Sequence, residues 1–117
     1  MTIPLEITCR NFPSTPTIEQ HVRKHIQRLA RYCDDIVSYR VLVETPHRHQ
    51  RKGRLYHVRI TLRLPGGELV VNRDPPERRA HEEVHVAIRD AFNACRRELQ
   101  DYVRVRRGDV KVATQAS

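Results

Sequence analysis

Two histidines one helical turn apart, with a glutamate directly after the first, are the best-defined candidate for catalytic chemistry in this chain. His81, Glu82 and His85 match the pattern H-E-x-x-H, in which both histidines bind zinc and the glutamate activates a water molecule. Such a site needs a third protein ligand. The downstream candidates, Glu98 and Asp101, lie further along the same predicted helix, which runs away from the site. We therefore do not favour a zinc hydrolase, although stoichiometric zinc that is lost in H85A would support one.

The other candidate reactive groups lack partners in the sequence. His47 and His49 have a chelating spacing for an extended segment, but no cysteine or carboxylate accompanies them, so phosphate contact or plain solvation is the preferred interpretation. Gly66 and Gly67 indicate a turn between strands rather than a phosphate-binding loop. No serine or cysteine has a recognisable base partner. We predict that the protein is not an enzyme and that it holds no metal and no cofactor.

Cationic side chains dominate the composition. The 117 residues include 22 Lys and Arg against 14 Asp and Glu, which gives a net charge of +8, and the isoelectric point is about 10.1. All but three of the cationic residues are arginine, whose planar guanidinium suits phosphate and guanine. This balance favours a nucleic acid over an anionic membrane as the partner. Cys9, Cys33 and Cys95 each lie in an apolar pattern and are expected to be reduced, core-packed thiols of a cytoplasmic protein.

Hydrophobic periodicity predicts four strands and two helices. Alternation of apolar and polar residues predicts strands at Ile3–Cys9, Val37–Val43, Tyr56–Leu64 and Leu69–Val71. A first helix is expected from the Thr15 N-cap and Pro16 to about Asp34, and a second from about His81 to a Gly108 C-cap. The apolar stripe of the first helix is Ile18, Val22, Ile26, Leu29, Ala30 and Cys33, and that of the second is Val84, Ala87, Ile88, Ala91, Phe92, Cys95, Leu99 and Tyr102.

The polar faces of both predicted helices are rich in arginine. A helical wheel places Arg23, Lys24, Arg28 and Arg31 on the exposed side of the first helix, and Arg89, Arg96, Arg97 and Arg104 beside the stripe of the second. One cationic face is often merely solvated, but two such faces indicate a surface for a polyanion. We expect these eight residues to contact nucleic-acid phosphates. Tyr32 and Tyr56 could stack on bases, but a place in the core is preferred for both.

The order of the elements predicts one α+β domain over residues 1–108, followed by a flexible tail or linker at 109–117. A strand–helix–strand unit pairs its strands in parallel, and the two later hairpins add antiparallel neighbours. The expected fold is therefore β-α-β-β-β-α, a four-stranded mixed sheet with both helices packed on one face. Segments 47–54 and 72–79 are expected to be irregular connections. The open face of the sheet would carry Arg10, Arg40, His57, Arg59 and Arg63 as a second cationic surface.

Several segments resemble one family. The pattern Leu5-Glu6-Ile7-Thr8 followed by Asn11, the run Arg28-Leu29-Ala30-Arg31-Tyr32-Cys33-Asp34-Asp35-Ile36, and the opening of the second helix, Glu83-Val84-His85-Val86-Ala87-Ile88-Arg89-Asp90, resemble the ribosome hibernation-promoting and ribosome-associated inhibitor family. The resemblance runs from about Ile3 to Val105. His85 stands where that family usually has an aromatic residue, and Arg89 where an acid is common.

This resemblance implies a double-stranded-RNA-binding-like fold that sits on the small ribosomal subunit, over the mRNA channel and the tRNA sites. It also implies inhibition of translation in resting, stationary-phase or stressed cells. Arg28 and Arg97 match basic positions of the family, whereas the other six residues rest on the helical wheel alone. The expected partners are the small subunit and its rRNA, with no membrane and no small-molecule substrate, while the oligomeric state stays open. The alternative is a general RNA- or DNA-binding module without ribosome specificity.

Overall fold

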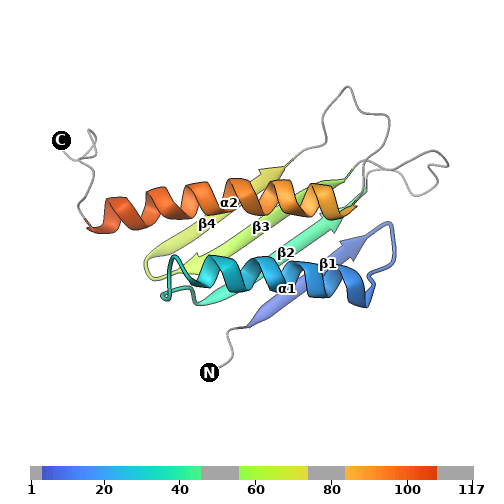
Figure 1. Cartoon of the computed structure of the whole chain (residues 1–117), viewed down its shortest axis with the longest axis horizontal. Coiled ribbons are helices and arrows are strands. Elements are labelled where there is room, and N and C mark those ends of the chain that lie inside the picture. The colour runs from blue at the N-terminus through green and yellow to red at the C-terminus, as the bar shows by residue number, and fades with distance from the viewer. Residues whose placement is uncertain (1–3, 46–55, 74–83, 108–117) are drawn as a thin grey trace.

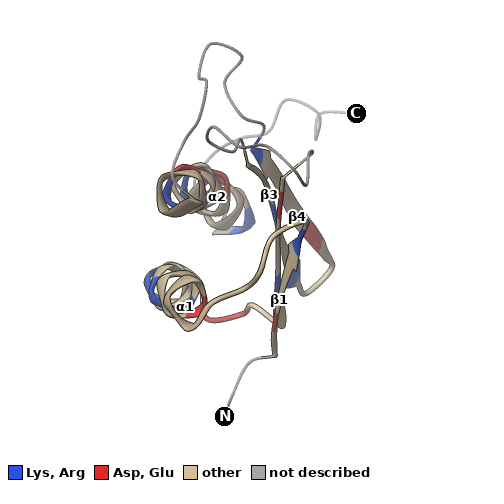
Figure 2. Ribbon diagram, turned by 90° about the vertical axis from the view of Figure 1, so that its right-hand side faces the viewer, with Lys and Arg blue, Asp and Glu red and all other residues tan. Residues whose placement is uncertain are grey.

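The computed structural model describes residues 4–45, 56–73 and 84–107. In these ranges the chain forms β1 (Leu5–Arg10), α1 (Pro16–Ala30), β2 (Ser38–Glu44), β3 (His57–Leu64), β4 (Gly67–Arg73) and α2 (Val84–Arg107). The strands form one sheet in the order β1-β2-β3-β4, in which β1 pairs with β2 in parallel and the other pairs are antiparallel. Both helices lie side by side on one face of this sheet (Figures 1 and 2). The predicted fold is confirmed.

Local hydrogen bonds fix the ends of α1. The Thr15 side-chain oxygen accepts a hydrogen bond from the Ile18 N–H at 3.2 Å, and Pro16 occupies the first turn, as the sequence predicts. The helix ends at Ala30, earlier than expected. The N–H groups of Arg31 and Tyr32 bond to carbonyls three residues back, and this tightening ends the α-helix. Ala30, at the edge of the apolar stripe, is exposed, so its predicted place in the core is wrong.

Strand register separates a buried face from an open one. The pairing places Ile7 beside Val41 and Val41 beside Ile60, and all three point toward the helices. β2 begins only at Ser38, so the alternation does not extend to Val37, which is 49% exposed, while Ile36 is buried instead. The prediction that Val37 belongs to the buried set is therefore wrong.

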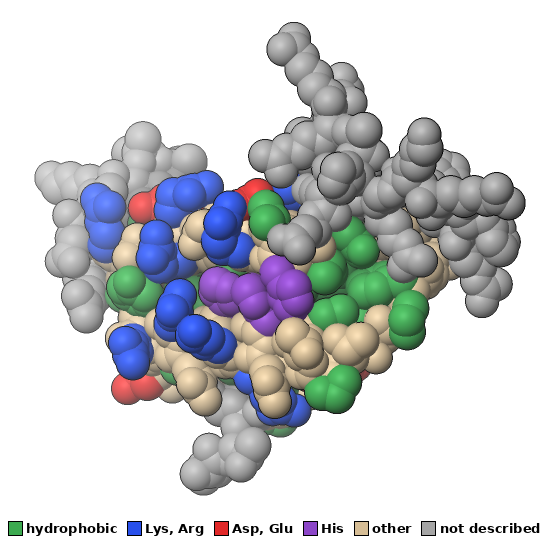
Figure 3. All heavy atoms as spheres, turned by 45° about the vertical axis from the view of Figure 1, so that its right-hand side comes forward, with side chains coloured by type: hydrophobic (Ala, Val, Ile, Leu, Met, Phe, Trp, Pro, Cys, Tyr) green, Lys and Arg blue, Asp and Glu red, His purple; other side chains and the backbone are tan. Residues whose placement is uncertain are grey.

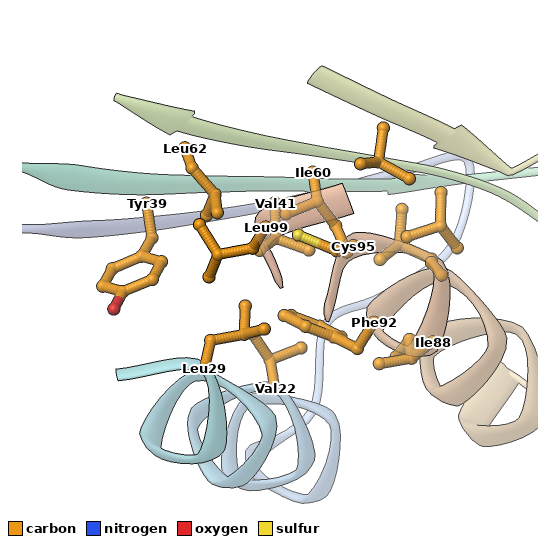
Figure 4. Packing of buried hydrophobic residues seen from close by; sticks show 14 of the residues in the cluster. Val22, Leu29, Tyr39, Val41, Ile60, Leu62, Ile88, Phe92, Cys95 and Leu99 are labelled. Carbon is orange, nitrogen blue, oxygen red and sulfur yellow. The ribbon is translucent and has the colours of Figure 1, made fainter. Parts of the chain in front are cut away.

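The core lies between the sheet and the two helices. Figure 4 shows Val22 and Leu29 of α1 and Phe92 and Leu99 of α2 meeting side chains from the sheet. Every residue of the predicted α2 stripe is buried or packed against the buried cluster. Burial, with a smaller effect from Glu98, raises the pKa of the Cys95 thiol to about 12, so it stays protonated.

The three cysteines are free, as expected for small core residues. Cys95 is fully buried, and Cys9 and Cys33 are half-buried against the core.

The open face of the sheet carries nearly balanced charge. Its arginines are Arg10, Arg40, Arg59 and Arg63, and its glutamates are Glu6, Glu44 and Glu68. Glu6 lies beside Arg40 in the register and 3.8 Å from its guanidinium, and Glu44 lies 3.0 Å from the His57 ring. The expected second cationic surface is therefore largely neutralised by glutamates on neighbouring strand positions.

Some predictions fall outside the described residues. They concern the connection at 47–54, including the His47 and His49 pair, the part of the second connection at 74–79, and the tail at 109–117 with the Gly108 cap. Asn72 and Arg73, which were expected to belong to that second connection, instead extend β4, so this part of the prediction is wrong. Within the described ranges, neither helix is both long enough and apolar enough to span a membrane.

Truncation of Leu99 tests the role of α2 in the core. Leu99 is completely buried, so L99A should lower the free energy of unfolding by about 2–5 kcal/mol, through lost burial and the cavity left behind. Urea denaturation followed by circular dichroism measures this change. V105A is the control, because Val105 lies on the same helix but is 38% exposed. A similar loss in both variants would contradict the assigned core.

Candidate nucleic-acid interface

The predicted contact residues lie on the two helices, on the side of the molecule away from the sheet. All eight are exposed: Arg23, Lys24, Arg28 and Arg31 on α1 or at its end, and Arg89, Arg96, Arg97 and Arg104 on α2. Figure 3 shows basic side chains of both helices gathered on one face of the molecule. Packing of both apolar stripes on the same sheet face directs these side chains outward.

A groove between α1 and α2 brings three of these arginines together. It has a volume of about 480 Å³ and is lined by His25, Arg28, Leu29, Arg31 and Tyr32 from one side and by Phe92, Asn93 and Arg96 from the other. Leu29 and Phe92 are buried and form its apolar floor. The polar lining residues other than His25 are three guanidinium groups, a phenol and an amide, and none of them is acidic. We call this feature the interhelical groove.

The remaining predicted residues lie outside the groove. Arg23 is about 160° around α1 from His25, which lines the groove, and Arg97 is about 100° around α2 from Arg96. Arg89 lies 3.4 Å from the Asp90 carboxylate, and Arg104 lies 3.6 Å from Asp101. These exposed ion pairs are weak and leave both arginines able to contact a phosphate.

Asp90 has a second cationic neighbour. Arg73 of β4, whose side chain is only 11% exposed, donates to Asp90 at 3.3 Å and to the Tyr56 carbonyl at 3.2 Å. Asp90 therefore links α2 to the edge of the sheet, and Arg89 shares this carboxylate rather than holding it alone.

Tyr32 lies at the mouth of the groove and not in the core. It is 41% exposed, whereas Tyr56 is buried as expected. Tyr32 follows the end of α1, so the helical stripe no longer governs its direction. The sequence contains no signal for this position, because its periodicity predicts a helix that reaches Asp34. An exposed aromatic ring beside arginines is a suitable platform for a base.

A contact cluster of three histidines, which we call the histidine cluster, adjoins the groove. His21 and His25 are one turn apart on α1, and their Nε2 atoms are 3.0 Å apart. The ring centroid of His85 is 4.7 Å from that of His21, and His25 stacks on Phe92 at 5.0 Å. Figure 3 shows the three rings together at the surface, between the basic side chains and an apolar region. Sequence reasoning missed this cluster. The four-residue spacing of His21 and His25 could have indicated the pair on α1, but the contact with His85 depends on how the two helices pack.

Burial and nearby positive charge favour the neutral forms of two of these rings. Burial, together with His21, Arg28, Lys24 and Arg89, lowers the pKa of His25 to about 4. Burial, His85, Lys24 and Arg28 also lower the pKa of His21. Each added proton would lie among charges of the same sign, in a partly buried site.

The histidines are not arranged as a preformed metal site. Within residues 4–45, 56–73 and 84–107, no group of three or more His, Cys, Asp or Glu side chains is placed to hold a metal ion. Among the described residues, the buried His85 Nδ1 has no hydrogen-bond partner, and the His85 ring packs against His21. His81 and Glu82 of the H-E-x-x-H pattern lie outside the described residues.

Comparison with known families identifies the class of protein. Residues 5–107 match the family model described as Sigma 54 modulation protein / S30EA ribosomal protein. The chain belongs to this family. The family predicted from the sequence is therefore confirmed, and this ribosome-associated modulation family is generally non-enzymatic. No curated protein sequence matches the chain.

Solved structures show the same fold as this S30EA-family chain. The N-terminal domain of Protein Y from Thermus thermophilus superposes with a TM-score of 0.66 at 22% identity, covering 87% of this chain and 99% of that domain. A ribosomal subunit interface protein from Coxiella burnetii superposes with a TM-score of 0.64 at 11% identity, covering 86% and 97% respectively. At these identities the similarity establishes the fold alone.

The lowered histidine pKa values predict a loss of stability in mild acid. Because the fold favours neutral His21 and His25, the unfolded chain takes up more protons as the pH falls. Their contribution to the free energy of unfolding is complete above pH 6.5, the ordinary histidine value, and is lost as the pH falls toward about 4, the pKa of His25.

Urea titrations at several pH values measure this dependence. H25Q should flatten it, because glutamine keeps a polar side chain without titrating. If the free energy of unfolding changed equally with pH in wild type and H25Q between pH 6.5 and 4, the lowered pKa of His25 would be contradicted.

Proposed function

We propose that this S30EA-family protein is a cytoplasmic hibernation factor that inhibits translation by binding small-subunit rRNA over the mRNA and tRNA sites. The observation that carries the proposal is the interhelical groove, in which Arg28, Arg31 and Arg96 converge from two helices without an acidic lining residue. Family membership supports a ribosomal partner. The arginines of the groove provide hydrogen-bond donors and positive charge for rRNA phosphates. A protein bound over the mRNA and tRNA sites would exclude mRNA and tRNA from the subunit.

Phosphate recognition explains the choice of side chains. Arginine donates two parallel hydrogen bonds to a phosphate, and a charge-assisted bond of this kind contributes about 1.5–3 kcal/mol. Three guanidinium groups held around one groove can bind the curved backbone of a structured RNA by its shape. Arg23, Lys24, Arg89, Arg97 and Arg104 surround this centre on the same two helices and would contact phosphates further along the RNA.

Tyr32 would add a contact with a base. Its ring lies at the groove among the arginines and is 41% exposed. Stacking of an unpaired base on an aromatic ring contributes about 1–3 kcal/mol and does not depend on the identity of the base. In this proposal the arginines bind the rRNA backbone while Tyr32 stacks on an unpaired nucleotide next to it.

A general RNA-binding module is the second candidate. The same lining residues favour it, because guanidinium groups that bind phosphates do not distinguish one nucleotide sequence from another. The two functions differ in what they bind: a hibernation factor binds small subunits much more tightly than arbitrary duplex RNA. As an occluding factor, the protein would use no cofactor and catalyse no reaction.

Charge reversal in the groove tests the proposed interface. R28E/R96E should weaken cosedimentation with purified small subunits by roughly 100-fold or more, since two charge-assisted contacts are lost. The matched control is R59E/R63E, which changes the net charge by the same amount on the open face of the sheet and should bind like wild type. Unchanged binding by R28E/R96E, or equal weakening by the two variants, would contradict the groove.

Competition separates the two candidate functions. An arbitrary RNA duplex in large excess should fail to displace the wild-type protein from small subunits. Equal affinity for the duplex and for the subunits would instead establish the general RNA-binding module. Both measurements must be made at one salt concentration, because phosphate binding weakens steeply as salt increases.

Substitution of Tyr32 tests the stacking contact. Y32A should weaken binding to small subunits by about 1–3 kcal/mol, whereas Y32F keeps the aromatic face and should bind nearly as well as wild type. Both substitutions occur at an exposed side chain, so thermal stability should change little. Equal binding by Y32A and wild type would exclude a stacking role.

A further inference from the structure

The histidine cluster is the one group of titratable side chains in the described residues that connects both helices at the groove. His25 lines the groove directly, and Arg28, three residues later on α1, lies on the same side of that helix. A phosphate bound by Arg28 would therefore lie within reach of the His25 ring. The cluster is connected to the proposed RNA site because His25 lines the same groove as Arg28.

We propose that His21 and His25 form a phosphate-binding subsite that takes up a proton when the RNA backbone occupies the interhelical groove. This inference rests on the proposed function, because the phosphate belongs to the rRNA backbone. At neutral pH both rings of the free protein are neutral, because both pKa values are lowered from 6.5. The bound phosphate supplies the negative charge that one imidazolium needs. Binding and proton uptake are then thermodynamically linked.

The geometry of the pair sets how many protons it can accept. With the two Nε2 atoms 3.0 Å apart, one nitrogen must carry the hydrogen and the other must accept it. A single added proton keeps this contact, now as a charge-assisted N–H···N bond. A second proton would place two N–H groups and two charges against each other. The pair therefore takes up no more than one proton on binding.

The surroundings explain why the proton arrives only with the ligand. The charged groups that act on the two rings are Lys24 and Arg28 of α1 and Arg89 of α2, and all three are cationic. His85 of α2 faces His21, and the ring of Phe92 covers one side of His25. The described residues thus supply no carboxylate that acts on either ring, and a phosphate would be the missing counter-charge. Glu82 and Glu83 lie outside the described residues.

Stacking on Phe92 orients the ring that meets the ligand. The planes of His25 and Phe92 are only 8° from parallel, and Phe92 is itself anchored in the core. A ring held in this way loses little conformational freedom when it binds. The electron-rich face of Phe92 also favours an imidazolium over a neutral ring.

The affinity for purified small ribosomal subunits, measured between pH 7.5 and 5.5 at constant ionic strength with EDTA present, tests the proposal. Wild-type affinity should rise by about three- to tenfold more than that of H21Q/H25Q, because one linked proton gives at most tenfold per pH unit. H57Q, which removes a histidine on the open sheet face, is the matched control and should follow wild type. Parallel pH profiles of wild type and H21Q/H25Q would overturn the proposal.

Calorimetry of the wild-type protein gives a test that needs no variant. Titration into small subunits at pH 6.0 in two buffers with different ionisation enthalpies measures the protons taken up on binding. A fraction of a proton, up to about one, that disappears in H21Q/H25Q supports the subsite. No uptake, or uptake that persists in that variant, overturns it.

Failure of the subsite and failure of the proposed function give different results. If R28E/R96E loses binding while wild type and H21Q/H25Q have parallel pH profiles, the groove is the interface and the histidines are not part of it. If R28E/R96E binds like wild type, both proposals are wrong.

Discussion

Burial of the α2 stripe against the sheet is the interaction on which the rest of the molecule depends. Six residues of this helix are almost completely inaccessible, and full burial of a large apolar side chain contributes about 1.5–3 kcal/mol. The exposed ion pairs of the same helix contribute about 1 kcal/mol each at most. The apolar stripe therefore decides the rotation of α2 about its axis. That rotation turns the edge with Asn93 and Arg96 toward α1 and so forms one wall of the groove.

The two faces of the molecule show that arginine content alone does not make an anion-binding surface. On the open sheet face, pairing of β1 with β2 places Glu6 beside Arg40, so opposite charges meet across strands. At the groove, two helices with separate apolar stripes bring arginines together without glutamates between them. The difference arises from how each element pairs with its neighbour, and it concentrates the uncompensated charge on the helical side.

Such a concentration of like charge lowers stability and is typical of a binding surface. The histidine cluster shows the consequence locally, because positive neighbours and burial lower the pKa values of His21 and His25. The fold tolerates this surface because its stability comes from the opposite side of the helices. Phe92 joins the two regions, since one face of its ring stacks on His25 while the side chain as a whole is buried in the core. Phe92 therefore belongs both to the hydrophobic core and to the surroundings of the histidine cluster.

The sequence by itself determined the element order, the fold class, the family and the exposure of the eight basic residues. Strand alternation and helical stripes are local patterns, so they predict which side of each element is buried. Only the tertiary structure decided that Arg28, Arg31 and Arg96 converge, that Tyr32 lies at the groove, and that His21 meets His85. A helical wheel gives directions about one axis and says nothing of the distance between two helices. That distance is set by the packing of both helices on the sheet, which no local pattern encodes.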